Sequence, residues 1–122
     1  EVCDVNPFGV IATQAAYNEG EEWLDQLIEY LHANYLYMRE FCREHLPEFP
    51  VTVLEGTYLV WMDCRKLCMS SEELERRLVA EAGLWLNAGT MYGWNIACPR
   101  NTLTEGLKCF VDFIKNLQWL HT

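Results

Sequence analysis

Basic residues are scarce in this sequence. It has 9 Lys+Arg against 18 Asp+Glu, a formal net charge of -9 and a pI near 4.7. The longest basic cluster is the pair Arg76-Arg77. Proteins that bind a nucleic-acid backbone or anionic lipid do so with clustered Lys and Arg. The composition therefore excludes nucleic acid and a membrane surface as partners.

Long hydrophobic runs are also absent. The longest apolar stretches are short, such as the five residues from Tyr58 to Met62, whereas a membrane-spanning helix needs about 18 apolar residues or more. The chain opens at Glu1 with no initiator Met and no basic region followed by an apolar one. We therefore expect no signal peptide and no membrane span, and we interpret the chain as a processed or excised piece.

Motifs of catalytic and phosphate-binding sites are missing as well. Gly83, Gly89 and Gly93 fit neither a Walker loop, nor a dinucleotide fingerprint, nor a nucleophile elbow. None of the lysines has the desolvated surroundings that a reactive lysine needs. There are three of them: Lys66, Lys108 and Lys115. These absences predict that the chain has no self-contained active site.

Metal ligands are too few for a site. A structural zinc site needs four ligands, and the pair Cys64-x-x-x-Cys68 has no matching second pair. Most of the cysteines lie within apolar patterns, where a free thiol behaves as a small hydrophobic group. They are Cys3, Cys42, Cys64, Cys68, Cys98 and Cys109. We predict no metal site, and six reduced and mostly inaccessible thiols in a cytoplasmic protein.

What is present is the pattern of one well-packed domain. The chain has 122 residues, of which 51% are hydrophobic, and a domain of this size buries roughly 70% of its unfolded surface. Asn6-Pro7 predicts the start of a short helix over 8–17. Asn18 and Glu21 resemble a capping box for a long helix whose apolar residues recur from Leu24 to Leu46, before Pro47 stops it.

The second half alternates strands and helices. Runs of β-branched and aromatic residues predict strands over 52–54, 58–62, 84–87 and 94–98. Ser70 or Ser71 and Gly83 bound one helix, and Asn101 or Thr102 caps a final one. The predicted fold class is α/β (α+β, two-layer): a small mixed or antiparallel sheet covered by helices and preceded by a long interdomain helix.

The long helix has more apolar surface than a small domain needs. A second stripe of Trp23, Tyr30, Tyr37 and Phe41 runs beside the first one. The excess indicates a missing partner. We expect the chain in isolation to self-associate through residues 7–41, because soluble monomers rarely expose large apolar patches.

Four ordered blocks together resemble one family. They are NPFGVIATQAAY at 6–17, EGEEWLD at 19–25, EGTYLVWMD at 55–63 and NIACPR at 95–100. The sequence is similar to the C-terminal third of fold-type I pyridoxal-phosphate enzymes, in the cystathionine β-lyase (C-S lyase) and class I/II aminotransferase branch. The resemblance implies an aminotransferase-type C-terminal domain: residues 1–20 are a remnant of the large domain, 21–46 the connecting helix and 47–122 the small domain.

The resemblance also implies where the chemistry lies. The family's cofactor-bound lysine and its other cofactor contacts lie upstream of this chain, so we expect no catalytic, cofactor-binding or metal residue here and no pyridoxal phosphate bound to the chain alone. The segment Gly56-Thr57-Tyr58, with Asn95, is expected to form the small-domain wall of the substrate pocket. The implied partners are the large cofactor domain, its homodimer mate and an amino-acid substrate.

One departure from the family concerns the substrate's carboxylate. Relatives have a Gly-rich stretch ending in Phe-x-Arg-x-Asn before the last block, and the arginine binds the substrate's α-carboxylate in a bidentate geometry that Lys does not reproduce. Here Gly93 stands two residues before Asn95, and Arg100 does not match the arginine position. Either this loop is deleted, or a disordered segment is missing from the sequence.

Two functions remain open on the sequence. The first is a C-terminal fragment of a pyridoxal-phosphate-dependent C-S β-lyase or aminotransferase of amino-acid metabolism, inactive alone. The NIACPR block resembles C-S lyases more than aminotransferases and favours the lyase. The alternative is a non-catalytic interaction module that reuses this domain, with the aromatic stripe as its contact surface.

Overall fold

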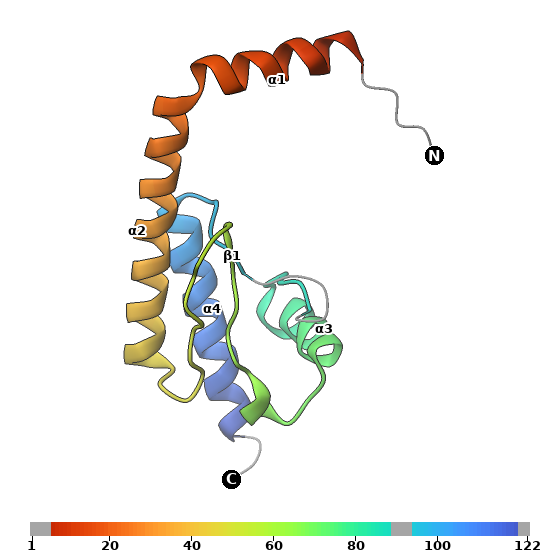
Figure 1. The fold of residues 1–122 in the computed structure, drawn as a ribbon. Helices are drawn as coiled ribbons and strands as arrows, with labels where there is room; N and C mark the ends of the chain where they lie inside the picture. Colours follow the sequence, from red (N-terminus) through yellow and green to blue (C-terminus); the bar gives the residue numbers. More distant parts are fainter. Residues whose placement is uncertain (1–5, 89–93, 120–122) are drawn as a thin grey trace. The chain divides into compact units, whose positions relative to one another are not determined.

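The computed structural model describes residues 6–88 and 94–119. The elements in chain order are α1 (Pro7–Glu19), α2 (Glu21–His45), β1 (Leu59–Val60), the 3-10 helix η1 (Arg65–Leu67), α3 (Ser71–Ala82), β2 (Trp94–Asn95) and α4 (Arg100–Trp119) (Figure 1). The chain divides into two compact units, the first ending at His32 and the second beginning at Ala33. The predicted fold class, helices with a small antiparallel sheet, is confirmed.

Local capping sets the first helix boundary as predicted. The Asn6 side chain accepts a hydrogen bond from the Gly9 N–H at 2.8 Å, and Pro7 occupies the first helical position. The predicted capping box at Asn18 is wrong, because Asn18 lies within α1. The break falls at Gly20, where any side chain would collide with the Ala16 carbonyl.

The apolar stripe of α2 is divided between the two units. In the second unit Tyr35, Met38 and Cys42 are buried, whereas in the first unit Leu24 and Ile28 are exposed. The second stripe is divided too. Tyr37 and Phe41 lie in the second unit, and their ring centroids are 6.2 Å apart. The Phe41 ring also packs against the His45 ring, with a centroid distance of 4.4 Å. Most of the exposed large apolar residues of α2 therefore lie in its N-terminal half, and Leu36 is the exposed one in the second unit.

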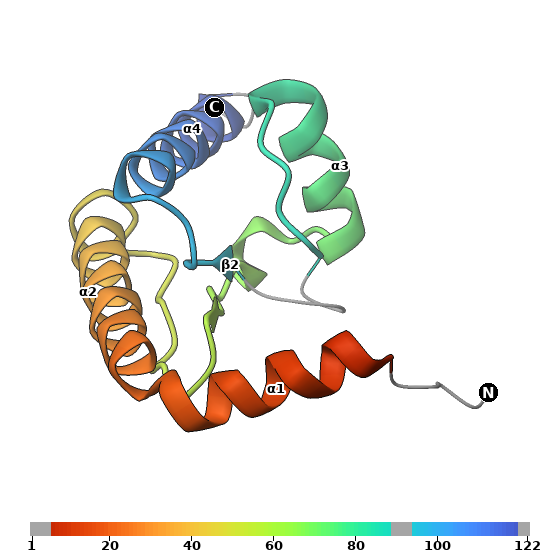
Figure 2. The same cartoon turned by 90° about the horizontal axis from the view of Figure 1, so that it is seen from above.

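The core of the second unit forms where α2, α3 and α4 surround the two strands (Figure 2). Helix α4 contributes one apolar face to this core, and its buried residues have the helical spacing that the sequence predicted. Its fully or almost fully buried members include Leu103, Leu107, Phe110, Val111, Ile114 and Leu117. Trp94 of β2 meets Phe110 edge to face at 5.3 Å, which joins the sheet to α4.

Two of the four predicted strands are present in shortened form. β1 and β2 lie within the predicted ranges 58–62 and 94–98, and they pair antiparallel with Leu59 opposite Asn95. The strand predicted at 52–54 is wrong, because pairing is limited to an isolated bridge between Val51 and Met62 and Val53 is 77% exposed. The strand predicted at 84–87 is wrong as well, because this segment is irregular and joins no ladder.

The predicted caps are correct for α3 and wrong for the start of α4. Ser70 accepts a hydrogen bond from the Glu73 N–H at 3.2 Å, and Gly83 ends α3 in the left-handed conformation, as predicted. The predicted cap of the last helix at Asn101 or Thr102 is wrong, because α4 begins at Arg100 and the Leu103 N–H bonds to the Pro99 carbonyl. An interaction from α2, described below, holds Arg100 at this position.

The five described cysteines form no disulfide, and they differ in exposure, while Cys3 lies outside the described residues. Cys42 is buried, Cys64 and Cys98 are half-buried, and Cys68 and Cys109 are exposed. The expectation of mostly inaccessible thiols is therefore wrong for Cys68 and Cys109. Cys68 occupies the left-handed position that ends η1, and Cys109 lies on the outer side of α4 between core residues.

Candidate functional site

The β1–β2 pairing brings together the four residues predicted to form a pocket wall. The Ile96 N–H donates to the Tyr58 carbonyl at 3.0 Å, and Leu59 lies opposite Asn95. The segment Gly56-Thr57-Tyr58 therefore lies at the same end of the sheet as Asn95, although the two are far apart in sequence. All four residues are exposed, so the structure presents them on the surface of the second unit.

Thr57 has a strained backbone. Its φ of 63° lies in the left-handed region, which β-branched residues rarely adopt. Its side-chain oxygen accepts a hydrogen bond from the Leu59 N–H at 3.2 Å, which closes the turn into β1. Strain of this kind collects at functional sites, where a particular backbone direction is needed. The turn directs Tyr58 away from the core, and Tyr58 is 46% exposed.

We predict that Thr57→Asn stabilises the chain. Asn tolerates the left-handed conformation and keeps a side-chain acceptor for the Leu59 N–H, so the free energy of unfolding should rise by about 1 kcal/mol. Thr57→Val keeps the strain and loses the acceptor, and it should lower that free energy by about 0.5–1 kcal/mol. Urea unfolding of the three proteins measures both. A Thr57→Asn variant less stable than the parent would show that the turn is unstrained.

Asn95 uses its side chain to turn the chain after β2. Its Oδ1 accepts a hydrogen bond from the Ala97 N–H at 2.8 Å, which is the geometry of an Asx turn. The turn sends residues 96–98 toward α2. Asn95 thus links the sheet to the loop that leads into α4.

A buried polar cluster that the sequence did not reveal receives this loop. Asn34, on α2, is 0% exposed. Its Nδ2 donates to the Ile96 carbonyl at 2.8 Å and to the Cys98 carbonyl at 3.1 Å, while its Oδ1 accepts from Arg100 Nε at 2.6 Å. One carboxamide therefore ties α2, the segment after β2 and the start of α4 together. The hint of this cluster in the sequence was the polar residue Asn34, which stands between Leu31 and Met38 on the apolar stripe of the long helix.

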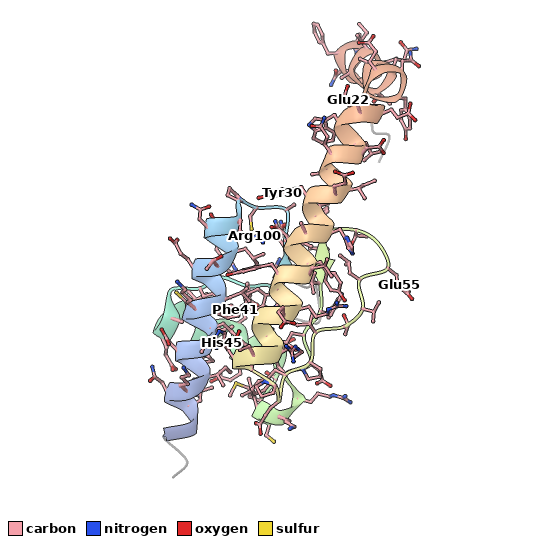
Figure 3. All side chains as sticks on the ribbon, turned by 90° about the vertical axis from the view of Figure 1, so that its left-hand side faces the viewer. Glu22, Tyr30, Phe41, His45, Glu55 and Arg100 are labelled. Carbon is pink, nitrogen blue, oxygen red and sulfur yellow. The ribbon has the colours of Figure 1, made fainter. Side chains whose placement is uncertain are left out.

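Arg100 is held from two further directions. Its guanidinium lies over the Tyr37 ring, 4.6 Å from the centroid, as a cation–π contact. Thr104 donates to the Arg100 carbonyl at 2.8 Å, and the Thr104 and Tyr37 hydroxyls are 3.0 Å apart. Figure 3 shows Arg100 at the N-terminal end of α4, beside α2. This side chain joins two helices.

A cavity of about 310 Å³ lies elsewhere in the second unit. Leu78, Trp94 and Phe110 are among its apolar lining residues, and Asp63 and Arg65 are among its polar ones. The Arg65 guanidinium donates to the Asp63 carboxylate at 2.9 Å, and this hydrogen bond lowers the pKa of Asp63 to about 2. The charges of the Asp63 carboxylate and the Arg65 guanidinium therefore neutralise each other. None of the four predicted wall residues lines this cavity.

None of the three lysines of the sequence is buried in the structure. A lysine bound to pyridoxal phosphate needs desolvated surroundings. Lys66 is exposed and lies 4.0 Å from Glu48, and Lys108 and Lys115 are exposed on α4. No group of three potential metal ligands occurs within residues 6–88 and 94–119. Gly93, at the position where the resemblance leads us to expect the carboxylate-binding arginine of relatives, lies outside the described residues.

In the described parts of the chain, none of the helices combines the length and the apolar character that spanning a bilayer requires.

Comparison with known proteins gives a consistent set of relatives. No family model matches the sequence. Cystathionine β-lyase PatB of Bacillus subtilis is 33% identical over 112 residues, which are 85% of this chain and 29% of PatB. The cystathionine β-lyase of Corynebacterium glutamicum is 37% identical over 114 residues, with 85% and 29% covered. The chain spans less than a third of these relatives and matches their C-terminal part.

Solved structures show the same similarity. Cystalysin from Treponema denticola, which contains pyridoxal 5'-phosphate, matches with a TM-score of 0.84 and 27% identity over 93% of this chain and 31% of cystalysin. The pyridoxal-phosphate-bound C-S lyase of Staphylococcus hominis matches with a TM-score of 0.80 and 30% identity, covering 93% of this chain and 32% of the lyase.

Proposed function

Because this chain is homologous to the C-terminal part of the cystathionine β-lyases and has the fold of that part in C-S lyases, we propose that it is the small C-terminal domain of a pyridoxal-phosphate-dependent C-S β-lyase or aminotransferase. The observation that carries this proposal is similarity in both sequence and fold along nearly the whole chain. The cofactor and its lysine would come from the remaining two thirds of the protein. The NIACPR block favours a lyase of amino-acid metabolism.

The domain boundaries form part of this proposal. Residues 1–20 would belong to the large domain, 21–46 to the connecting helix and 47–122 to the small domain. The observed limits of α2, Glu21–His45, support the helical segment. The large domain and a homodimer mate would be the protein partners, and an amino acid the substrate.

We assign the wall of the substrate pocket to Gly56, Thr57, Tyr58 and Asn95. Three properties support this assignment: the sheet gathers these residues at one end, they are exposed in the chain alone, and Thr57 is strained. Their role would be to shape the pocket and exclude water. The described residues place no arginine in this wall, so the substrate's carboxylate would need a donor from outside it.

The proposed function predicts that the chain alone has no lyase activity. Mixed with pyridoxal phosphate and a cysteine thioether such as cystathionine, it should release no pyruvate, because the lysine that binds the cofactor is expected upstream of Glu1. The protein made from the extended reading frame should release pyruvate. Pyruvate release by residues 1–122 alone would refute the proposal. Formation of a keto acid from the substrate only when an acceptor keto acid is added would identify an aminotransferase instead.

The wall assignment is tested in the extended protein. Tyr58→Ala should lower kcat/KM about tenfold, equivalent to about 1.4 kcal/mol of transition-state stabilisation. The matched control is Val53→Ala, a change at another exposed residue of the same loop. Equal kcat/KM values for the two variants would show that Tyr58 is not part of the pocket wall.

One observation favours the second candidate, a non-catalytic interaction module. Phe8, Tyr17 and Trp23 are 83%, 87% and 67% exposed, as expected for a contact surface. The reading frame decides between the two functions. An upstream segment that encodes a cofactor-binding lysine supports the enzyme, and a start codon directly before residue 1 supports the module.

The absence of a disulfide among the five described cysteines supports a reducing compartment, for which we propose the cytoplasm. Burial raises the pKa of Cys42 to about 12 and that of Cys64 to about 11. Because the thiolate is the reactive form, iodoacetamide should label Cys68 and Cys109 in the native chain and reach Cys42 and Cys64 only in denaturant. Mass spectrometry of the labelled peptides measures this. Labelling of Cys42 as fast as Cys109 would contradict the buried position.

A further inference from the structure

A continuous chain of hydrogen bonds runs through the second unit from Arg100 to Asn95. Arg100 Nε donates to Asn34 Oδ1 at 2.6 Å, and Asn34 Nδ2 donates to the Ile96 carbonyl at 2.8 Å. The other end of the same peptide group makes the next bond, in which the Ala97 N–H donates to Asn95 Oδ1 at 2.8 Å. Two carboxamides and one peptide group therefore connect the start of α4 to a residue of the proposed pocket wall.

The partners of the two carboxamides fix their orientation. Arg100 Nε and the Ala97 N–H can only donate, and the Ile96 carbonyl can only accept. The oxygen of each carboxamide therefore receives a hydrogen bond from within the chain of bonds, and Asn34 uses its nitrogen to continue it. The corresponding nitrogen of Asn95, Nδ2, is the last donor of the series. Asn95 is exposed, so the series leads from a buried carboxamide to the surface of the wall.

The series begins at a positive charge. The Arg100 guanidinium lies over the Tyr37 ring, 4.6 Å from its centroid, and none of the ion pairs among residues 6–88 and 94–119 includes it. No described carboxylate therefore cancels this charge. Hydrogen bonds in series polarise one another where the local dielectric is low, and Asn34 is 0% exposed.

The lengths of the bonds agree with this polarisation. None of the three is longer than 2.8 Å, whereas N–H···O bonds in proteins are most often about 2.9–3.0 Å long. Short bonds of this kind are typical of hydrogen bonds to a charged group. The positive charge of Arg100 therefore strengthens the donor character of the carboxamide at the far end of the series.

We propose that Asn95 Nδ2 donates a hydrogen bond to a carboxylate oxygen of the amino-acid substrate, and that Asn34 and Arg100 are positioning residues that orient and polarise it. This inference rests on the function proposed above. A carboxylate fits this donor, because a polarised N–H group binds an anionic oxygen more strongly than a neutral one. Asn95 would add one neutral hydrogen bond to the charged donor that the carboxylate needs from outside the wall.

The substitution Asn95→Asp separates this role from the Asx turn. Asp keeps the oxygen that accepts from the Ala97 N–H, so the urea midpoint of the variant should equal that of the parent. It also puts a negative oxygen in place of Nδ2. In the extended protein, KM for S-ethylcysteine should rise at least about thirtyfold, because a hydrogen bond to a charged group becomes a repulsion. The matched control is Asn116→Asp, an exposed site near the other end of α4, where KM should stay within about twofold because salt screens the distant charge.

A substrate analogue tests whether the partner is the carboxylate. In S-ethylcysteine amide, a neutral carboxamide that can also donate replaces the carboxylate. The rise in KM caused by Asn95→Asp should therefore shrink at least about tenfold with the amide. An unchanged KM in Asn95→Asp, or an equal rise with both substrates, would overturn the inference and leave the proposed function intact. An extended protein that turns over neither substrate would overturn the proposed function, and this inference with it.

The role of Arg100 is tested by removing its charge. Arg100→Gln should raise KM for S-ethylcysteine about fivefold with kcat within about twofold, because the hydrogen bond from Asn95 is no longer strengthened by a charge. Arg100→Lys keeps a positive donor and should recover most of this loss. Lys115→Gln removes the same charge at an exposed position of α4 and should leave KM within about twofold. Equal KM values in Arg100→Gln and Lys115→Gln would show that Arg100 does not act on Asn95.

Discussion

Replacing Asn34 by Leu should lower the free energy of unfolding by about 3–5 kcal/mol. Leu has the same number and branching of side-chain heavy atoms as Asn, but none of them is polar. The change leaves the buried carbonyls of Ile96 and Cys98 without a donor and Arg100 Nε without its acceptor. Domains of this size are stable by about 5–15 kcal/mol, so the loss would be a large share of the total. Urea unfolding followed by circular dichroism measures it.

The matched control for this variant is Asn101→Leu. Asn101 is exposed in the first turn of α4, next to Arg100, and its replacement should change the free energy by less than about 0.5 kcal/mol. A loss below about 1 kcal/mol for Asn34→Leu would mean that water replaces the carboxamide. In that case the Asn34 cluster does not hold the start of α4.

Phe110→Ala should be as damaging, by about 3–5 kcal/mol, because it removes a large side chain from a packed core. Phe110 is 1% exposed, meets Trp94 edge to face and lies 6.5 Å from the Phe113 ring. It also lines the cavity beside the sheet, so its loss would enlarge a space that already exists instead of letting the core collapse.

The same substitution at Phe8 provides the control. Phe8 is 83% exposed, and Phe8→Ala should change the free energy of unfolding by less than about 0.5 kcal/mol. The contrast separates the packed second unit from the exposed residues of the first unit. A large loss for Phe8→Ala would show that Phe8 is packed in the free chain.

The sequence by itself predicted the helices, because capping and helical periodicity are local. Asn6, Ser70 and Gly83 form hydrogen bonds with residues three to five positions away, and each begins or ends a helix as predicted. The four sequence blocks also identified the family, and the relatives confirm it. The strands were less predictable. A strand needs a partner, and the segments 52–54 and 84–87 have strand-like composition but join no ladder.

The tertiary structure alone decided which residues act together. Arg100, the first residue of α4, donates a hydrogen bond to Asn34, 66 residues earlier, and no local pattern near residue 100 predicts that contact. The same is true of the apolar stripe of α2, where burial of Met38 and exposure of Ile28 depend on which other elements reach each turn. Helical periodicity specifies a face, whereas burial and long-range hydrogen bonds specify its neighbours, and only the folded chain supplies those neighbours.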